Sequence, residues 1–209
     1  MVKGHEIKAL MAVDLDGTLL RGNSLHIFAV CSLRDALRHG RMTQAATVAG
    51  WLALRRLRLC PHTRMKWAII GATAITPSFK ADFVHKIHTS INPRVKVLID
   101  ERRNRGWTVL LATAAADLYV PWIWDGPYVA TRTAGNPSHT ECRGEEKLKA
   151  VMAYADNNGL TPTAIVTDHH DDLALLTAPF AERILVSPSA RTLRAIKDAG
   201  ITIDTLIEH

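Results

Sequence analysis

Short apolar runs that end at polar residues constrain the fold of this chain more than any other feature. There are four of them, at residues 10–13, 108–112, 164–166 and 183–186. Runs of this length that are rich in aliphatic side chains are typical of buried parallel strands. Between them, apolar residues recur with helical spacing, as in residues 148–155. Strands that alternate with helices predict an α/β fold, with a Rossmann-like parallel sheet and helices on both faces.

The stretch from about residue 25 to residue 88 interrupts this alternation, because it has helical patterns and no convincing strand. Its apolar spacing predicts four helices, at residues 25–39, 43–59, 65–73 and 78–88. We therefore expect two domains. The α/β core comprises residues 1–22 and 92–209, and a small all-helical cap of residues 23–91 is inserted after the first strand.

The inserted segment is strongly basic. Residues 21–92 contain eleven Lys and Arg against two acids, and so carry a charge of +9 in a chain whose net charge is +6. A field of this sign attracts anionic ligands, although a solvated helical surface is the simpler interpretation. Apolar side chains such as Trp51 and Leu57 are interleaved with the arginines. An anionic membrane surface is therefore an alternative partner for this segment.

Composition excludes several other classes of protein. The three cysteines, Cys31, Cys60 and Cys142, are odd in number and far apart, which suggests neither a disulfide framework nor a Cys-rich metal site. The first ten residues lack the apolar stretch of a signal peptide. No run approaches the ~18 apolar residues that span a bilayer. We expect a cytoplasmic protein without a transmembrane segment and, since no nucleic-acid-binding motif is present, without a nucleic-acid partner.

Polar and acidic side chains follow the predicted strands. These side chains are Asp14, Asp16, Thr113, Asp168, Asp171 and Asp172. Because ligands of open parallel sheets bind at the carboxyl ends of the strands, we expect these side chains to converge. Convergent carboxylates suit a hard cation such as Mg²⁺. A carboxylate beside such a cation can attack phosphorus.

Four segments in the expected order carry a family resemblance. They are DLDGTLL at 14–20, Thr113 after TVLLA, Lys147 in CRGEEK, and TDHHDDLALL at 167–176. Together they resemble the four motifs of the haloacid-dehalogenase-like superfamily over nearly the whole chain. The position of the predicted cap and the CRGEEK string are similar to the phosphoserine-phosphatase-like branch, of subfamily IB type. The pair His170–Asp171 is also found in all-helical HD phosphohydrolases, but here it follows a strand-like run.

The resemblance implies a role for each motif residue. Asp14 would be the nucleophile and Asp16 the general acid. Thr113, the main chain at Ala114, and Lys147 would bind the phosphate. A Mg²⁺ ion would be held by Asp14, Asp16 through its main-chain carbonyl, Asp168, and one of two further acids. The spacing in that branch favours Asp172 over Asp171 as the last ligand.

The resemblance also implies a reaction. A second acid at Asp16 favours phosphate esters over carbon–halogen bonds, since an alkoxide leaving group needs a proton. We expect a Mg²⁺-dependent phosphomonoesterase that forms an aspartyl-phosphate and acts on a small phosphorylated metabolite. Alternatives are a phosphomutase, a phosphatase of lipid-linked or aromatic phosphates, or a non-catalytic phosphate-binding module. Phosphoserine is disfavoured, because residues 21–24 lack a Glu and residues 114–116 are alanines rather than Gly-Gly. The sequence indicates no oligomeric state.

Overall fold

The computed structural model describes residues 8–136 and 138–208. These residues form two compact units. Unit 1 comprises the chain up to Gly22, Ile91–Asn136 and the residues from Thr140 onward, and unit 2 comprises Asn23–Ser90 with residues 138 and 139. The chain therefore leaves unit 1 after its first strand and returns to it at residue 91.

Unit 1 is built on a six-stranded sheet in which every neighbouring pair is parallel. The strand order is β3-β2-β1-β4-β5-β6. The bounds are β1 Ala9–Val13, β2 Thr108–Ala116, β3 Tyr128–Thr131, β4 Thr161–Thr167, β5 Glu182–Val186 and β6 Thr205–Ile207. The predicted α/β fold class is confirmed. All five residues of β1 are buried, as the apolar run predicts for a central strand.

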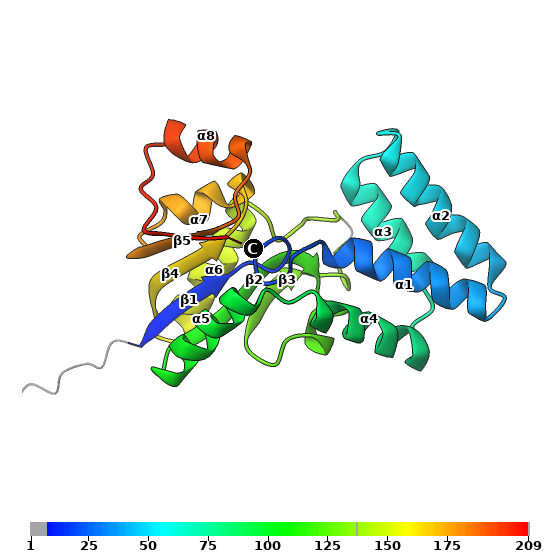
Figure 1. The fold of residues 1–209 in the computed structure, drawn as a ribbon, viewed down its shortest axis with the longest axis horizontal. Coiled ribbons are helices and arrows are strands. Elements are labelled where there is room, and N and C mark those ends of the chain that lie inside the picture. The colour runs from blue at the N-terminus through cyan, green and yellow to red at the C-terminus, as the bar shows by residue number, and fades with distance from the viewer. Residues whose placement is uncertain (1–7, 137, 209) are drawn as a thin grey trace, which may run out of the picture. The chain divides into compact units, whose positions relative to one another are not determined.

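Helices cover both faces of this sheet (Figure 1). They are α5 Pro93–Asn104, α6 Glu145–Asn157, α7 Leu173–Thr177 and α8 Ala190–Asp198, with 3₁₀ turns at Val120–Trp122 and His170–Asp172. Residues of α6, α7 and α8 share one buried cluster with alternate residues of β1 and β2, such as Leu10 and Leu110. Helix α5 packs against β2 and buries Val95 and Ile99 outside that cluster. Because successive side chains of a strand point to opposite faces of the sheet, each face packs against its own layer of helices.

Two strands were not predicted, and each of the four predicted strands is longer than its apolar run. β3 and β6 lie at the two edges of the sheet and keep several half-exposed or exposed residues. An edge strand needs no continuous apolar run, so the sequence gives little signal for it. Strand β2 continues to Ala116, with irregular pairing to β3 after Ala112. Thr113 therefore lies within β2 and not at its end.

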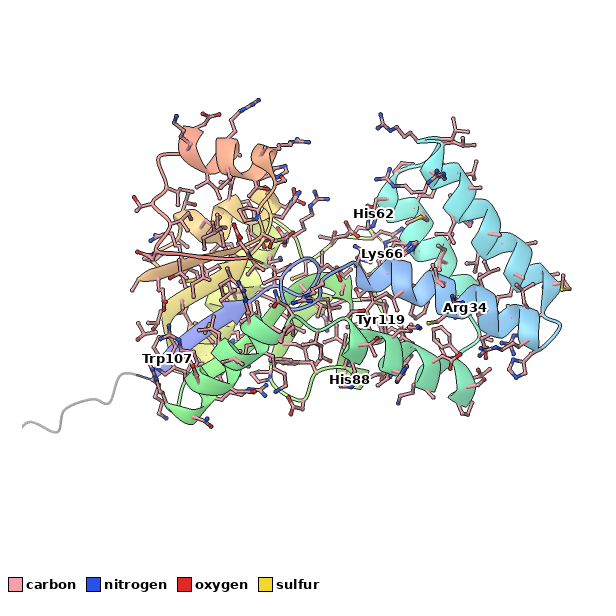
Figure 2. All side chains as sticks on the ribbon, viewed as in Figure 1. Arg34, His62, Lys66, His88, Trp107 and Tyr119 are labelled. Atoms are coloured by element: carbon pink, nitrogen blue, oxygen red, sulfur yellow. The ribbon has the colours of Figure 1, made fainter. Side chains whose placement is uncertain are left out.

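The amino ends of the strands are marked by an aromatic residue. Trp107 directly precedes β2, and the guanidinium of Arg102 lies 4.5 Å from the centre of its ring. Figure 2 labels Trp107 near the amino ends of the strands of unit 1. The polar residues that follow the strands lie at the opposite ends of the strands, the carboxyl ends.

Unit 2 consists of four helices, α1 Ser24–Arg38, α2 Met42–Arg56, α3 His62–Ala72 and α4 Pro77–Thr89. Their positions agree with the four predicted helices. The side chains of Asn23 and Thr76 cap the amino ends of α1 and α4. Phe28 packs edge-to-face on Phe79, with ring centres 4.9 Å apart, and both are fully buried. Across the described residues of both units, no helix is long and apolar enough to cross a bilayer.

A buried carboxylate joins three helix ends of unit 2. Asp35, on α1, accepts hydrogen bonds from the hydroxyls of Ser78 at 2.7 Å and Thr76 at 3.0 Å, at the start of α4. The guanidinium of Arg41, at the start of α2, pairs with the same carboxylate. Burial alone would raise the pKa of Asp35, but these hydroxyls and Arg41 hold that pKa below its ordinary value. The cluster is thus a fully satisfied ion pair.

Candidate active site

The loop that follows β1 places the first acidic residues of the site. The Asp14 N–H donates to the Val166 carbonyl at 2.9 Å, so the pairing of β1 with β4 continues to Asp14. The loop then turns back, because the Gly17 N–H donates to the Gly22 carbonyl at 3.0 Å. The Asp14 residue is only 8% exposed, while Asp16 is half-buried. Asp14 is therefore held rigidly at the carboxyl end of the central strand.

Lys147 reaches Asp14 from the first turn of α6. Its Nζ atom donates a hydrogen bond to Asp14 Oδ1 at 2.8 Å. The same nitrogen lies 2.7 Å from Asp172 Oδ1 and 3.0 Å from Asp172 Oδ2. Lys147 is 3% exposed, so one buried ammonium bridges two carboxylates that come from different strand ends.

Asp172 is engaged by protein groups on both of its oxygens. Besides its contacts with Lys147, it accepts a hydrogen bond from the Thr167 hydroxyl at 2.7 Å. Its Oδ1 atom lies beside Lys147 without the angle of a hydrogen bond. We expected Asp172 among the metal ligands. Its contacts suit a role in orienting Lys147, and its predicted role as a metal ligand stays a prediction.

Asp168, directly after β4, packs against the loop that carries Asp14. The Thr18 hydroxyl donates to Asp168 Oδ1 at 3.3 Å. A Cβ atom on Gly17 would lie 2.2 Å from Asp168 Oδ2, and Gly17 has a φ of +84°. Glycine is therefore required at residue 17 both for the backbone conformation and for the approach of the carboxylate.

The predicted phosphate-binding residues lie in the irregular part of β2. Thr113 is buried, and its hydroxyl oxygen accepts a hydrogen bond from the Ala115 N–H at 3.0 Å. The hydroxyl proton can therefore be donated to another acceptor. The Ala114 carbonyl accepts a bond from the Thr131 hydroxyl at 2.7 Å, which ties this part of β2 to β3.

The sequence analysis missed Arg143. Its guanidinium lies 2.5 Å from Asp171 Oδ2, and Asp171 also lies 2.9 Å from His169 Nδ1. Burial would raise the pKa of Asp171, but the hydrogen bond from Arg143 and the neighbouring His169 lower it. The CRGEEK string contained this arginine, yet nothing in its spacing pointed to a partner in the 167–176 segment. Asp171, the alternative to Asp172 as the last metal ligand, is thus paired with Arg143.

Burial and crowding disturb the titration of the site. Burial raises the pKa of Asp14 to about 8, even though Lys147 acts in the opposite direction. Burial likewise raises the pKa of Asp168 to about 6. For Lys147, burial acts to lower the pKa, but Asp14 and Asp172 together raise it. Lys147 therefore stays charged, but its single positive charge does not balance the negative charge of the carboxylates.

The donor set fits a divalent cation. Asp14 and Asp172 share a single buried ammonium, Asp172 contributes to the raised pKa of Asp168, and Asp16 contributes to the raised pKa of Asp14. Carboxylate and carbonyl oxygens are the ligands that Mg²⁺ prefers. Among the described residues, the one trio with ligand atoms all within 4.8 Å of each other is His169, His170 and Asp171. The side-chain oxygens of the predicted ligands do not all come within this distance of one another. The main-chain carbonyl of Asp16 is a further predicted ligand, and this side-chain comparison does not include it.

Comparison with protein-family models gives a match over residues 11–177, to the haloacid dehalogenase-like hydrolases. The match spans the segments that contain Asp14, Thr113, Lys147 and Asp168. Comparison with curated protein sequences gave no match.

Several solved structures share the fold. A protein of unknown function from Bordetella pertussis Tohama I has a TM-score of 0.68 and 18% identity, and the alignment covers 96% of this chain and 98% of that one. A phosphoserine phosphatase, solved as an analogue of its phospho-aspartyl intermediate, has a TM-score of 0.61 and 14% identity, with 98% and 95% covered. A hydrolase from Salmonella enterica serovar Typhi has a TM-score of 0.61 and 12% identity, with 96% and 67% covered. At these identities the likeness shows the fold alone.

Proposed function

Because the chain belongs to the haloacid dehalogenase-like hydrolase family, we propose that it is a Mg²⁺-dependent phosphatase that hydrolyses phosphate monoesters through an aspartyl-phosphate. Its substrate would be a small phosphorylated metabolite. We further propose that the helical unit inserted after the first strand, residues 23–91, is the cap of this enzyme, and that unit 1 is the catalytic core.

The observation that carries this proposal is the contact of Lys147 Nζ with Asp14 Oδ1 at 2.8 Å. A carboxylate at the end of the central strand is thereby paired with a cation that stays charged. Such a pair can hold a phosphate against the carboxylate, because the ammonium offsets the repulsion between two anions. Both groups lie in a buried setting, where electrostatic interactions are stronger than in water.

The proposed reaction has two steps. An Asp14 oxygen attacks phosphorus, the bond from phosphorus to the ester oxygen breaks, and Asp16 gives its proton to the leaving oxygen. Asp16 then takes a proton from water, whose oxygen attacks the phosphorus of the aspartyl-phosphate. This restores Asp14 as a carboxylate and releases inorganic phosphate.

The remaining residues bind and orient. The Thr113 hydroxyl would donate to a phosphate oxygen, as would main-chain N–H groups near Ala114. Lys147 would stabilise negative charge on the transferring group. Asp14, the Asp16 carbonyl and Asp168 would hold Mg²⁺, which when bound supplies positive charge to the phosphate oxygens. We assign Asp172 to the orientation of Lys147, since its oxygens contact Lys147 and Thr167.

Hydrolysis of p-nitrophenyl phosphate by the full chain tests this function. Turnover should require Mg²⁺, cease on addition of EDTA, and be abolished in Asp14→Asn. Asp16→Asn should keep Mg²⁺ and phosphate binding but lose about 10²–10⁴-fold in turnover, since it lacks the general acid.

The matched control is Asp156→Asn, an exposed acid on α6, which should leave turnover unchanged. Normal turnover in Asp14→Asn would overturn the proposed mechanism. A chain that binds Mg²⁺ but hydrolyses no phosphate ester in a screen of phosphorylated metabolites would instead be a phosphate-binding module. Formation of an isomeric phosphate ester in that screen would indicate a phosphomutase.

A further inference from the structure

The turn between α2 and α3 exposes three leucines within six residues. Leu54 is 39% exposed, Leu57 66% and Leu59 69%. Every residue from 53 to 59 is exposed. In Figure 1 this turn forms an end of unit 2 that stands clear of α1 and α4. Scattered exposed leucines need no explanation, but a contiguous group of them indicates a surface that is covered by something else.

The backbone holds these leucines in a defined arrangement. The Leu59 N–H donates to the Leu54 carbonyl at 2.9 Å, and the Arg58 N–H donates to the Arg55 carbonyl at 3.0 Å. This pair of bonds is the Schellman ending of a helix, and Arg58 has the left-handed φ of +59° that it requires. The motif brings the residues at positions 54 and 59 together, yet both leucines stay exposed to solvent. The apolar group is thus part of an ordered turn.

Arginines alternate with the leucines. Arg55, Arg56 and Arg58 are all exposed, and none forms an ion pair with a carboxylate of the described residues. Residues 36–81 contain no Asp or Glu at all. The two acids that flank this stretch already pair with arginines outside the turn, since Asp35 contacts Arg41 and Asp82 contacts Arg38.

The positive charge of the turn is therefore uncompensated. It extends onto α3, where Arg64 is exposed and the first turn holds no acid. The exposed arginines of the turn and Arg64 thus lie in a stretch of sequence that holds no acidic residue.

We propose that this patch, defined as Leu54, Arg55, Arg56, Leu57, Arg58 and Leu59, docks on the surface of an anionic lipid bilayer. The three leucines enter the boundary between headgroups and acyl chains, and the guanidinium groups bind lipid phosphates. A bilayer surface offers an apolar layer directly beneath a phosphate layer, which matches a patch that presents both kinds of side chain.

Other partners match only half of the patch. A nucleic acid would satisfy the arginines but leave the leucines in water, since phosphate contacts supply most of its non-specific binding. A second copy of this turn would cover the leucines but bring like charges together. The proposal concerns unit 2 alone and does not rest on the phosphatase activity.

Co-sedimentation of the full chain with lipid vesicles tests the proposal. We expect binding to phosphatidylcholine vesicles that contain one third phosphatidylglycerol, no binding to phosphatidylcholine alone, and weaker binding at high salt. Arg56→Gln/Arg58→Gln should lower the partition coefficient about 30-fold, since each arginine near an anionic surface contributes about 1 kcal/mol. Leu57→Ser/Leu59→Ser should lower it about tenfold or more, because apolar burial is lost.

The matched control is Leu193→Ser/Arg194→Gln, an exposed leucine–arginine pair on α8, which should bind as the natural chain does. Circular dichroism and thermal unfolding verify that each variant is folded. Equal binding to neutral and anionic vesicles, or no binding to either, would overturn the proposal. So would a leucine variant that binds normally, since binding would then be attraction between charges alone. Loss of binding in the α8 control would show that the patch has no special role.

Discussion

Lys147 Nζ lies 2.7 Å from Asp172 Oδ1 while it also donates to Asp14 Oδ1. Asp172 therefore holds the ammonium together with Asp14. The Thr167 hydroxyl fixes Asp172 in turn, at 2.7 Å. This chain of buried contacts links β4 to the end of β1 through α6, and it explains why an acid five residues after Thr167 can influence the proposed nucleophile.

Replacing Asp172 separates a positioning role from metal binding. In Asp172→Asn the amide oxygen still accepts a bond from Thr167, but the charge that orients Lys147 is lost. We expect kcat to fall about 10–100-fold, as is typical when a partner of a site residue is removed. KM and the Mg²⁺ concentration for half-maximal turnover should stay nearly unchanged. Steady-state kinetics at varied Mg²⁺ measures all three quantities.

Asp168→Asn is the matched comparison, because it should raise the Mg²⁺ concentration for half-maximal turnover about 10–100-fold. Equal increases in that Mg²⁺ concentration for both variants would indicate that Asp172 is a metal ligand. The outcome would then support the ligand set expected from the sequence.

Gly17 is the residue at which an added methyl group should do most damage. A Cβ atom there would lie 2.2 Å from Asp168 Oδ2, and the φ of +84° is unfavourable for alanine. Gly17→Ala should therefore displace Asp168, weaken Mg²⁺ binding and lower Tm. Gly106→Ala is the control, since its φ is +78° with nothing within 4 Å of a Cβ atom. It should lower Tm through backbone strain of about 1 kcal/mol and leave Mg²⁺ binding intact. Equal Mg²⁺ affinity in the two variants would contradict the contact with Asp168.

Much of the fold could be predicted because its signals are local. The central strand β1 and the second half of β4 are buried, so each contains a short apolar run in the sequence. The four helices of unit 2 follow from the helical spacing of their apolar residues. Strands β3 and β6 escaped prediction because edge strands keep exposed residues and need no such run.

The site was predictable in its residues but not in their pairings. Their positions after the strands predicted that Asp14 and Asp168 would converge, and the family resemblance added Lys147 to the predicted site. Nothing in the sequence could show that Asp172 would contact Lys147, since Lys147 lies in the first turn of α6 and Asp172 follows β4, and the two meet only after α6 packs on the sheet. Arg143 was missed for the same reason, because its partner Asp171 lies beyond β4.

The buried ion pair of unit 2 should contribute strongly to stability. Asp35→Asn leaves Arg41 without its charged partner in a buried cluster, and we expect the free energy of unfolding to fall by about 3–5 kcal/mol. Asp82→Asn is the control, because its pair with Arg38 is largely exposed and should contribute less than about 1 kcal/mol. Urea denaturation followed by circular dichroism measures both. Similar losses in the two variants would contradict a special role for burial.

The contribution of Asp35 should depend on pH in a defined direction. Its folded-state pKa lies below its ordinary value of 3.8, so the folded protein binds the proton less readily than the unfolded chain does. The stabilisation is therefore fully present above pH 3.8 and is lost as the pH falls through the lower folded-state pKa. The difference in unfolding free energy between the natural chain and Asp35→Asn should shrink only in that acidic range. A difference that shrinks as the pH rises would have the wrong sign.

Arg58 occupies a backbone position that suits glycine. Its φ of +59° lies in the left-handed region, at the residue that follows the cap of α2 in the Schellman ending. Glycine adopts this conformation without the steric penalty that a Cβ atom brings, which is roughly 1–2 kcal/mol. Arg58→Gly should therefore stabilise unit 2 by about 1 kcal/mol and raise Tm by a few degrees. Arg56→Gly, two residues earlier at the last residue of α2, should lower Tm, because glycine is less favourable than arginine in the helical conformation, by up to about 1 kcal/mol. Thermal unfolding of both variants decides the matter, and a lower Tm for Arg58→Gly would show that the arginine itself stabilises the turn.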